Sequence, residues 1–316
     1  MRPTCVNKIF ELAKRDPRVA YIGSDLDPPI TKRMQVDMPG RAWMEGVSEQ
    51  HVVGMAAGLA MEGFIPYVHT IATFITRRCY EQVAVDLCLH NLPVRLIGNG
   101  GGLVYAPLGP THLAIEDIAI MRALPNMTVV AVCDADEMKR FMDQTLDWPG
   151  PIYIRLAKGY DPIVSRDELG FSIGKAILMR EAAARSKRVL LVTTGVATTR
   201  ALAAAEELAA EGIDCSLLHM HTIKPLDGEA VVAHARGCDL VVTIEEHTVV
   251  GGLGSAVVDT LVDALPSAMP PVKRLGIPDD FAHNYGSQDQ LMELYGLQPP
   301  GIAQTIRDAL RPRRAA

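Results

Sequence analysis

The sequence predicts an α/β protein of two consecutive domains, each a mostly parallel sheet flanked by helices. The first observation is an alternation of short β-branched runs with helical patterns along the 316 residues. The second is composition: 48% of residues are apolar but only 5% are aromatic, so aliphatic side chains must build the cores. Such cores suit parallel sheets that are buried on both faces. The third is length, because 316 residues suffice for two domains of ordinary size.

Strands and helices are expected to alternate through the first half of the chain. The expected strands are 19–26, 65–71, 94–100, 127–133 and 151–157. The helical patterns between them cover 5–15, 48–62, 74–90, 112–123 and 134–146. Asp134 directly follows a strand and precedes an amphipathic pattern, which predicts that it caps the next helix.

A charged and less regular stretch at 158–186 interrupts this rhythm, and we interpret it as the inter-domain connection. The pattern then restarts, with strands expected at 189–195, 215–221, 239–246 and 272–278, followed by helical segments. The expected organisation is therefore a first domain at 1–165, a linker at 166–186 and a second domain at 187–316.

Charge and composition exclude several classes of function. The net charge of −6 and the scattered basic residues argue against a nucleic-acid surface. No stretch of about 18 apolar residues exists, so no membrane span is expected. Charges interrupt the N-terminal segment, so no signal peptide is expected there. The six cysteines lack metal-type spacing and are expected to be reduced, buried thiols of a cytoplasmic protein.

Glu49 stands at the start of a predicted helix that is made almost wholly of small apolar residues. Ser48 is the expected N-cap, and Gly54 and Gly58 leave room for another backbone to approach. The helix dipole favours an acidic residue in a first turn, which is the ordinary explanation of Glu49. However, its apolar flanks favour a carboxylate that is buried or at an interface, and such a carboxylate needs a partner.

Two further clusters could carry chemistry. Phe74 and Arg77 share a helical face, as do Arg77 and Glu81, although an amphipathic helix with one surface ion pair explains them equally well. His112 is expected to open a helix after the glycine run 100–102, at a strand end where ligands bind in open α/β sheets. A structural histidine is the alternative. The later segment EEHTVVGGLGSAV matches a nucleotide-binding loop only in part, so its glycines are expected to serve close helix packing.

As an ordered set, these motifs resemble the C-terminal half of the transketolase family, which depends on thiamine diphosphate. The resemblance rests on VSEQHVVGMAAGLAMEG, TFITRRCYEQ, GPTHLAIEDIAIMRALPNMTVV, IYIRLAKG, TIKPLD and EEHTVVGGLGSAV, and it covers nearly the whole chain. It implies a pyrimidine-binding domain followed by a transketolase C-terminal domain.

In this family a Gly-Asp-Gly…Asn motif in a preceding domain holds Mg²⁺ and the diphosphate, and the chain contains no Gly-Asp-Gly. The resemblance therefore implies the second subunit of a split transketolase, inactive alone, whose partner subunit supplies the magnesium site. Pairing of pyrimidine domains around a two-fold axis implies self-association, and a heterotetramer is expected.

The resemblance also assigns roles to the cofactor-binding residues. Glu49 matches the glutamate that hydrogen-bonds the pyrimidine nitrogen N1′ and thereby promotes proton removal from the thiazolium ring. Phe74 matches the aromatic residue that stacks on the aminopyrimidine. Asp25 matches an aspartate near the thiazolium.

Three residues match substrate-binding positions of the family. His112 matches a catalytic histidine that contacts sugar hydroxyls, while Arg155 and Arg77 match arginines that bind substrate phosphate. Pro29, Gly100 and the segment 106–109 depart from the usual transketolase pattern where substrate lies, which puts the usual sugar phosphates in question.

The favoured function is transfer of a two-carbon ketol unit from a ketose, expected to be a phosphate, to an aldehyde acceptor. One alternative is the β subunit of another thiamine-diphosphate enzyme, of the 2-oxo acid dehydrogenase or deoxyxylulose-phosphate synthase type. A second alternative is a non-catalytic scaffold subunit, which the presence of the cofactor residues argues against.

Overall fold

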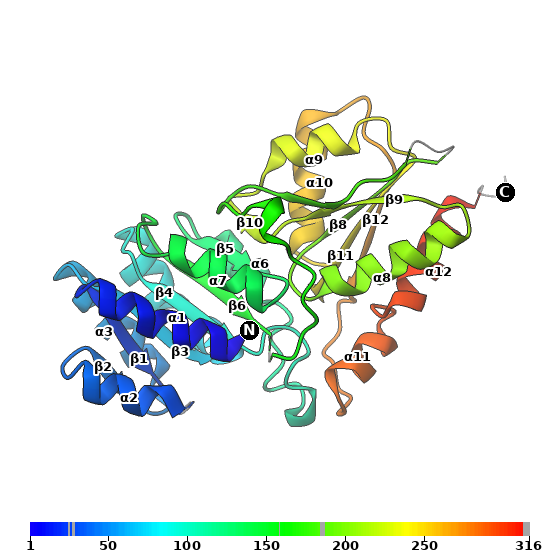
Figure 1. Cartoon of the computed structure of the whole chain (residues 1–316). Coiled ribbons are helices and arrows are strands. Elements are labelled where there is room, and N and C mark those ends of the chain that lie inside the picture. The colour runs from blue at the N-terminus through cyan, green and yellow to red at the C-terminus, as the bar shows by residue number, and fades with distance from the viewer. Residues whose placement is uncertain (25, 27–28, 158, 184–186, 312–316) are drawn as a thin grey trace.

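The computed structural model describes residues 1–24, 26, 29–157, 159–183 and 187–311. Two sheets of seven and five strands lie side by side, each with helices packed against it (Figure 1). The predicted α/β class with two consecutive, mostly parallel sheets is confirmed. Among the described residues, no helix has the length and apolarity needed to span a bilayer.

The first sheet has the strand order β10-β5-β6-β4-β3-β1-β2. Its strands are β1 (Val19–Gly23), β2 (Ala42–Met44), β3 (Ile65–Ile71), β4 (Arg95–Asn99), β5 (Thr128–Ala131), β6 (Ile152–Leu156) and β10 (Thr222–Lys224). All neighbours are parallel except β10, which runs antiparallel to β5. Every residue of β1, β3, β4 and β6 is buried, as expected of a parallel sheet covered on both faces.

Helices cover both faces of this sheet and enclose two hydrophobic cores. They are α1 (Arg2–Arg15), α2 (Pro29–Asp37), α3 (Glu49–Met61), α4 (Ala72–Arg77), α5 (Tyr80–Gln82), the π-helical η1 (Val83–Leu89), α6 (Asp117–Ala123) and α7 (Ala135–Gln144). One core joins α1 to α7 through residues such as Ile9 and Phe141. The other joins α3 to α4 through residues such as Val52 and Ile75.

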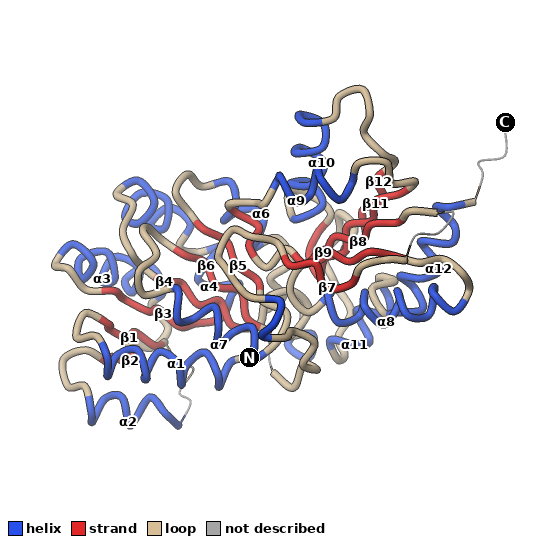
Figure 2. Tube along the Cα trace, turned by 45° about the horizontal axis from the view of Figure 1, so that its top comes forward, coloured by secondary structure: helices blue, strands red, loops and turns tan. Residues whose placement is uncertain are grey.

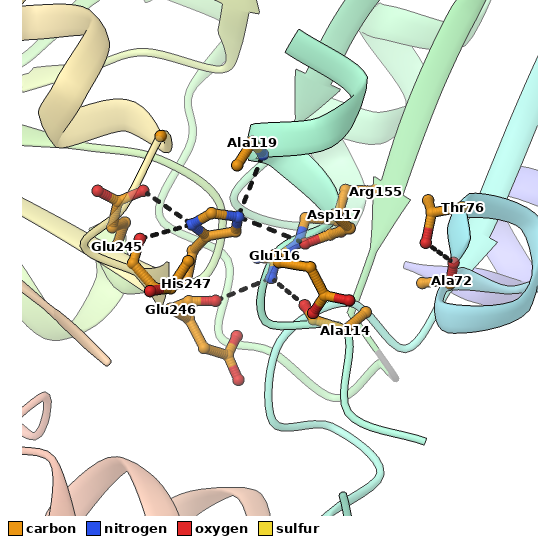
Figure 3. Close-up of polar contacts among 12 residues, drawn as sticks. Ala72, Thr76, Ala114, Glu116, Asp117, Ala119, Arg155, Glu245, Glu246 and His247 are labelled. Atoms are coloured by element: carbon orange, nitrogen blue, oxygen red, sulfur yellow. Dashed lines mark hydrogen bonds and ion pairs between the residues drawn. The ribbon is translucent and has the colours of Figure 1, made fainter. Parts of the chain in front are cut away.

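The single helix expected at 74–90 is wrong, because the structure divides this segment into α4, α5 and η1. The hydroxyl of Thr76 donates to the carbonyl of Ala72 at 2.7 Å (Figure 3), a bond that commonly bends a helix. The helix expected at 112–123 begins only at Asp117, because the backbone before it pairs with the glycine loop 100–102. Helix α2 and strand β2 are not predicted by the sequence pattern.

The second sheet has the strand order β12-β11-β8-β9-β7. Its strands are β7 (Ile177–Arg180), β8 (Val189–Thr193), β9 (Cys215–His219), β11 (Leu240–Thr248) and β12 (Val272–Ile277). Helices α8 (Ala197–Ala210) and α12 (Pro299–Leu310) cover one face, and α9 (Gly228–Ala235) and α10 (Leu253–Ala264) cover the other (Figures 1 and 2). Helix α11 (Gln288–Leu294) and short 3₁₀ turns at Ala106–Leu108 and Asp167–Leu169 complete the fold.

Two strands lie where the sequence pattern does not place them. Strand β7 falls within the expected linker 166–186, yet it pairs antiparallel with β9 and closes the second sheet. Strand β10 comes from the second half of the chain, yet it pairs with β5 at the edge of the first sheet. Strand β10 therefore joins the second half of the chain to the first sheet, whereas β7 extends the second sheet into the expected linker.

Candidate functional site

Glu49 begins α3, and its side chain is only 2% exposed. Ser48 occupies the expected N-cap position, but its hydroxyl donates to the carbonyl of Glu45 at 2.9 Å instead of capping the helix. Oε2 of Glu49 accepts a hydrogen bond from Nη1 of Arg78 at 3.2 Å. Oε1 is buried and has no hydrogen-bond partner among the described residues. The predicted burial of this carboxylate is confirmed, and one of its oxygens is left with an open acceptor position.

Phe74 lies on α4, and Arg78 contacts both Phe74 and Glu49. The guanidinium carbon of Arg78 sits 4.1 Å from the centre of the Phe74 ring. The imidazole of His112 meets the same ring edge-on, with 5.2 Å between ring centroids. The structure thus brings together three residues that are far apart in the sequence, namely Glu49, Phe74 and His112.

His112 lies in a turn before α6 and not at a helix start, which corrects the expected position. Its backbone N–H donates to the carbonyl of Gly109 at 3.0 Å, and Nδ1 lies 2.9 Å from the hydroxyl of Thr111. The ring of Tyr105 approaches it edge-on at 6.4 Å. No described hydrogen bond uses Nε2. The half-buried imidazole is therefore held by its loop with one nitrogen free for a ligand.

Arg77 forms its ion pair with Glu116 and not with Glu81, because the helix breaks directly after it. Its Nε and Nη2 both meet the Glu116 carboxylate, the latter at 2.8 Å, and Nη2 also donates to the carbonyl of Leu113 at 2.9 Å. The two side chains are 33% and 30% exposed. Arg77 thus links α4 to the loop that carries His112.

Arg155 on β6 lies deeper, with a side chain that is only 6% exposed (Figure 3). Its Nε donates to Oδ2 of Asp117 at 2.8 Å, and Nη2 donates to the carbonyls of Ala114 and Glu246 at 3.1 and 2.8 Å. Burial alone would lower the pKa of Arg155, but the carboxylates of Asp117 and Glu246 outweigh it and hold that pKa above its ordinary value. None of the described contacts uses Nη1.

The glycine run after β4 is required by close packing. Gly100 and Gly102 have φ of +77° and +68°. A Cβ at Gly100 would overlap the Tyr105 ring, and one at Gly102 would lie 2.5 Å from the carboxyl carbon of Glu246. Oε1 of Glu246 in turn accepts from the backbone N–H of Leu103 at 2.8 Å, so the loop is tied down onto the second domain.

Residues 245–247 form a buried cluster of polar contacts between the domains, which the sequence patterns do not indicate (Figure 3). The carboxylate of Glu245 accepts from the N–H groups of Leu253 and Gly254 at 2.7 and 2.8 Å and so caps α10. Nε2 of His247 accepts from the N–H of Ala119 on α6 at 3.3 Å. In the sequence, this cluster is marked only by adjacent charged residues at the end of an expected strand. Such a local pattern does not indicate which residues of the other domain they contact.

The glycines that follow residues 245–247 confirm the expected close packing. A Cβ at Gly252 would overlap Oε2 of Glu245, and one at Gly254 would lie 2.7 Å from the hydroxyl of Thr243. These positions bring the start of α10 against β11.

A second buried cluster joins α7 to β9. The ligand-type atoms of Cys133, Glu137 and His219 lie within 4.8 Å of one another, and all three residues are buried. Oε2 of Glu137 accepts from the backbone N–H of Cys133 at 2.6 Å and lies 3.0 Å from Nε2 of His219, whose Nδ1 meets the hydroxyl of Thr198 at 2.9 Å. Burial raises the pKa of the Cys133 thiol, which disfavours the thiolate that a metal needs. We interpret the cluster as a domain contact.

All six cysteines are free, and five of them are buried.

Asp25, which the resemblance places near the thiazolium ring, lies outside the described residues. Its role stays a prediction.

Two family models match the chain in succession. The model "Transketolase, pyrimidine binding domain" matches residues 2–160, and the model "Transketolase, C-terminal domain" matches residues 179–302. Together they span both sheets except for the first two residues of β7.

Individual proteins give the same result over nearly the full length. The 6-deoxy-6-sulfo-D-fructose transketolase subunit of Clostridium sp. (strain MSTE9) is 37% identical over 309 residues, which are 98% of this chain and 94% of that protein. A subunit of the apulose-4-phosphate transketolase of Phocaeicola vulgatus is 33% identical over 98% of this chain and 97% of its own length. A solved split-gene transketolase, described as an inactive beta4 tetramer, superposes with a TM-score of 0.86 at 33% identity, covering 99% of this chain and 98% of that chain.

Proposed function

The chain belongs to the transketolase family, and from that premise we propose that it works as one subunit of a split enzyme transferring a two-carbon ketol unit. The donor is a ketose and the acceptor an aldehyde. The observation that carries this proposal is the buried carboxylate of Glu49, with its unpartnered Oε1, beside the ring of Phe74. The two relatives from Clostridium and Phocaeicola are themselves single subunits of about this length, which favours the split organisation.

The residues present fit the aminopyrimidine of thiamine diphosphate. A buried oxygen without a partner costs free energy, and a ring nitrogen that shares a proton with it removes that cost. Phe74 offers an aromatic surface for stacking. When bound, the cofactor would supply an acidic thiazolium carbon, which becomes the nucleophile for a ketose carbonyl once its proton is lost. Glu49 would hold the proton at pyrimidine N1′, inside a site from which most water is excluded.

His112, Arg155 and Arg77 are proposed to bind the substrate. His112 would use its free Nε2 to bond sugar hydroxyls beside the cofactor ring. Arg155 would use Nη1, because its other nitrogens already bind Asp117 and two carbonyls. Arg77 is the more exposed arginine and would bind an anionic end group of the sugar while it stays paired with Glu116. Asp25 is proposed to offset the charge of the thiazolium.

A partner subunit with a Gly-Asp-Gly…Asn motif is proposed to hold Mg²⁺ and the diphosphate. This chain would supply the pyrimidine side of the site and would associate with itself through its first domain. The similar split-gene structure, described as an inactive beta4 tetramer, supports self-association without activity. We propose a heterotetramer of the two subunit types that works in the cytoplasm on small sugars.

Reconstitution tests the proposal. The purified chain is mixed with its Gly-Asp-Gly-bearing partner, thiamine diphosphate, Mg²⁺, an aldehyde acceptor and a ketose carrying either a phosphate or a sulfonate. Ketol transfer is expected in the mixture and in neither subunit alone. Turnover with pyruvate as donor, in place of a ketose, would contradict ketol transfer and support the deoxyxylulose-phosphate synthase or 2-oxo acid dehydrogenase type.

A further inference from the structure

We propose that Arg78 occupies the place of the cofactor's aminopyrimidine ring in the free chain and leaves it when the cofactor enters. The proposal rests on the proposed function, because it concerns the same two residues, Glu49 and Phe74. It adds a residue that neither the family resemblance nor the sequence patterns assigned. Arg78 then controls how readily the subunit accepts the cofactor.

The first observation is the stacking of Arg78 on Phe74. The guanidinium is planar, and its central carbon lies 4.1 Å from the centre of the ring. A flat cation at this distance is attracted by the electron-rich face of the ring and covers it.

The second observation is the ion pair of Arg78 with Glu49. Nη1 lies 3.2 Å from Oε2, while the Glu49 side chain is 2% exposed and the Arg78 side chain is 44% exposed. A buried carboxylate without a cation or donor is strongly destabilising, so the free chain needs this contact. Arg78 satisfies only one of the two oxygens, because Oε1 has no partner among the described residues.

Arg78 thus covers Phe74 and pairs with Glu49, the two residues that a flat, nitrogen-bearing ring would contact. Because one guanidinium reaches both residues, Glu49 lies on the side of Phe74 that Arg78 covers. A ring that stacks on Phe74 and also bonds Glu49 must use that side, and it therefore competes with Arg78.

Arg78 is well placed to move aside. It follows the end of α4 and precedes α5, so it lies at a break between two short helices. Its partly exposed side chain reaches solvent without unfolding either helix. A competitor that must leave lowers the apparent affinity for the ligand by the fraction of time that the site is open.

The test measures binding of the cofactor's 4-aminopyrimidine fragment to the full-length chain by calorimetry. Arg78→Met is expected to bind the fragment about tenfold more tightly than the wild type, because the competitor is gone. The same variant is expected to unfold at a lower temperature, because Glu49 loses its partner. A gain in affinity together with a loss of stability is a combination that a merely structural arginine would not produce.

Arg33→Met is the matched control. Arg33 also stacks on a phenylalanine, with its guanidinium carbon 5.3 Å from the Phe10 ring, and it also pairs with a carboxylate, Asp37, at 3.3 Å. Its fragment affinity should equal that of the wild type. If Arg78→Met does not fold, Arg78→Lys serves in its place, because it keeps the charge but loses the flat group, and a smaller gain is expected.

Equal or weaker fragment binding by the Arg78 variants overturns the proposal. If the reconstituted complex still transfers ketol units in that case, the proposed function stands without it. If no ketol transfer occurs but Arg78→Met binds the fragment more tightly, the proposed displacement of Arg78 stands and only the proposed ketol-transfer reaction is wrong. If neither the wild type nor any variant binds the fragment, this proposal fails.

Discussion

Two carboxylates that are adjacent in the sequence, Glu116 and Asp117, each form an ion pair with an arginine, but one pair is partly exposed and the other is buried. Asp117 and Arg155 are 0% and 6% exposed, whereas Glu116 and Arg77 are 30% and 33% exposed. A buried pair cannot lose one partner without leaving an uncompensated charge, while an exposed pair is screened by water. The two arginines are therefore expected to differ in their importance for stability.

Arg155→Ala should lower the free energy of unfolding by about 3–5 kcal/mol, because Asp117 stays buried without its cation. Arg77→Ala, the comparison variant, should lower it by no more than about 1 kcal/mol. Urea titration of both variants measures the difference. Equal, small changes would contradict the buried ion pair. A KM for phosphorylated donors that is unchanged in Arg155→Ala would remove Arg155 from substrate binding.

At the scale of elements, one carboxylate organises the start of α7. As predicted, Asp134 caps this helix, with Oδ1 accepting from the N–H groups of Asp136 and Glu137 at 3.0 and 2.9 Å. Its Oδ2 also accepts from the N–H groups of Val164 and Ser165 at 2.8 and 2.7 Å. Burial opposes ionisation, but these N–H donors outweigh it and hold the pKa of Asp134 below its ordinary value. The cap thereby anchors the chain that leaves the first domain.

This lowered pKa sets the expected pH dependence of Asp134→Asn. A carboxyl whose folded pKa is depressed stabilises the fold fully above its unfolded value of 3.8, and this stabilisation is lost as the pH falls through the folded pKa. Asp134→Asn should therefore cost about 1–3 kcal/mol near neutral pH, and the cost should shrink below pH 3.8. Urea unfolding at a series of pH values from about 3 to about 8 measures it.

The control is Asp136→Asn in the same turn, whose carboxylate forms an exposed contact with Lys139. It should change stability by less than about 1 kcal/mol at any of these pH values. A cost of Asp134→Asn that persists unchanged into acid would show that the charge of the cap has no part in its stabilisation.

At the scale of the whole molecule, α3 presents a face that no described residue covers. A Cβ at Gly54 or Gly58 would meet no described atom within 4 Å, while Val52, Val53, Ala56 and other residues of the opposite face are buried. The small outer residues fit the predicted close approach of a second subunit. The chain's self-association should therefore be sensitive to a large side chain here.

Gly54→Arg should reduce the oligomer formed by the free chain, as measured by light scattering coupled to gel filtration. The folded chain has space for the side chain, and arginine is favoured over glycine within a helix. Ala203→Arg, at an exposed position of α8 in the second domain, is the control and should leave the mass unchanged. An unchanged oligomer in Gly54→Arg would place the interface elsewhere.

The fold class is predictable because strand and helix periods are local, but the pairing of the edge strands β7 and β10 is not. Strand β7 places Ile177 opposite His219 of β9, and β10 places Thr222 opposite Val130 of β5. Such partners meet only in the folded chain, so no local pattern reveals them. The break after α4 likewise depends on how Thr76 bonds Ala72, which helical periodicity does not indicate.

The candidate site is predictable where a residue's own surroundings signal its role. The apolar flanks of Glu49 indicate burial, and the structure has it buried. The contacts of Arg155 with Asp117 and Glu246 join three segments, and they cannot be read from the sequence. Arg78 has only its spacing of four residues from Phe74 as a signal, and that spacing is common in helices.

Glu49 is proposed to activate the cofactor, and the ketol-transfer rate of the reconstituted complex carrying Glu49→Gln tests this role directly. Since general acid–base groups contribute about 10²–10⁴-fold, kcat should fall by at least about 100-fold. Glu62→Gln, at the exposed C-terminal end of the same helix, should keep the wild-type rate. Full activity in Glu49→Gln, with the cofactor bound, would show that Glu49 does not activate the cofactor.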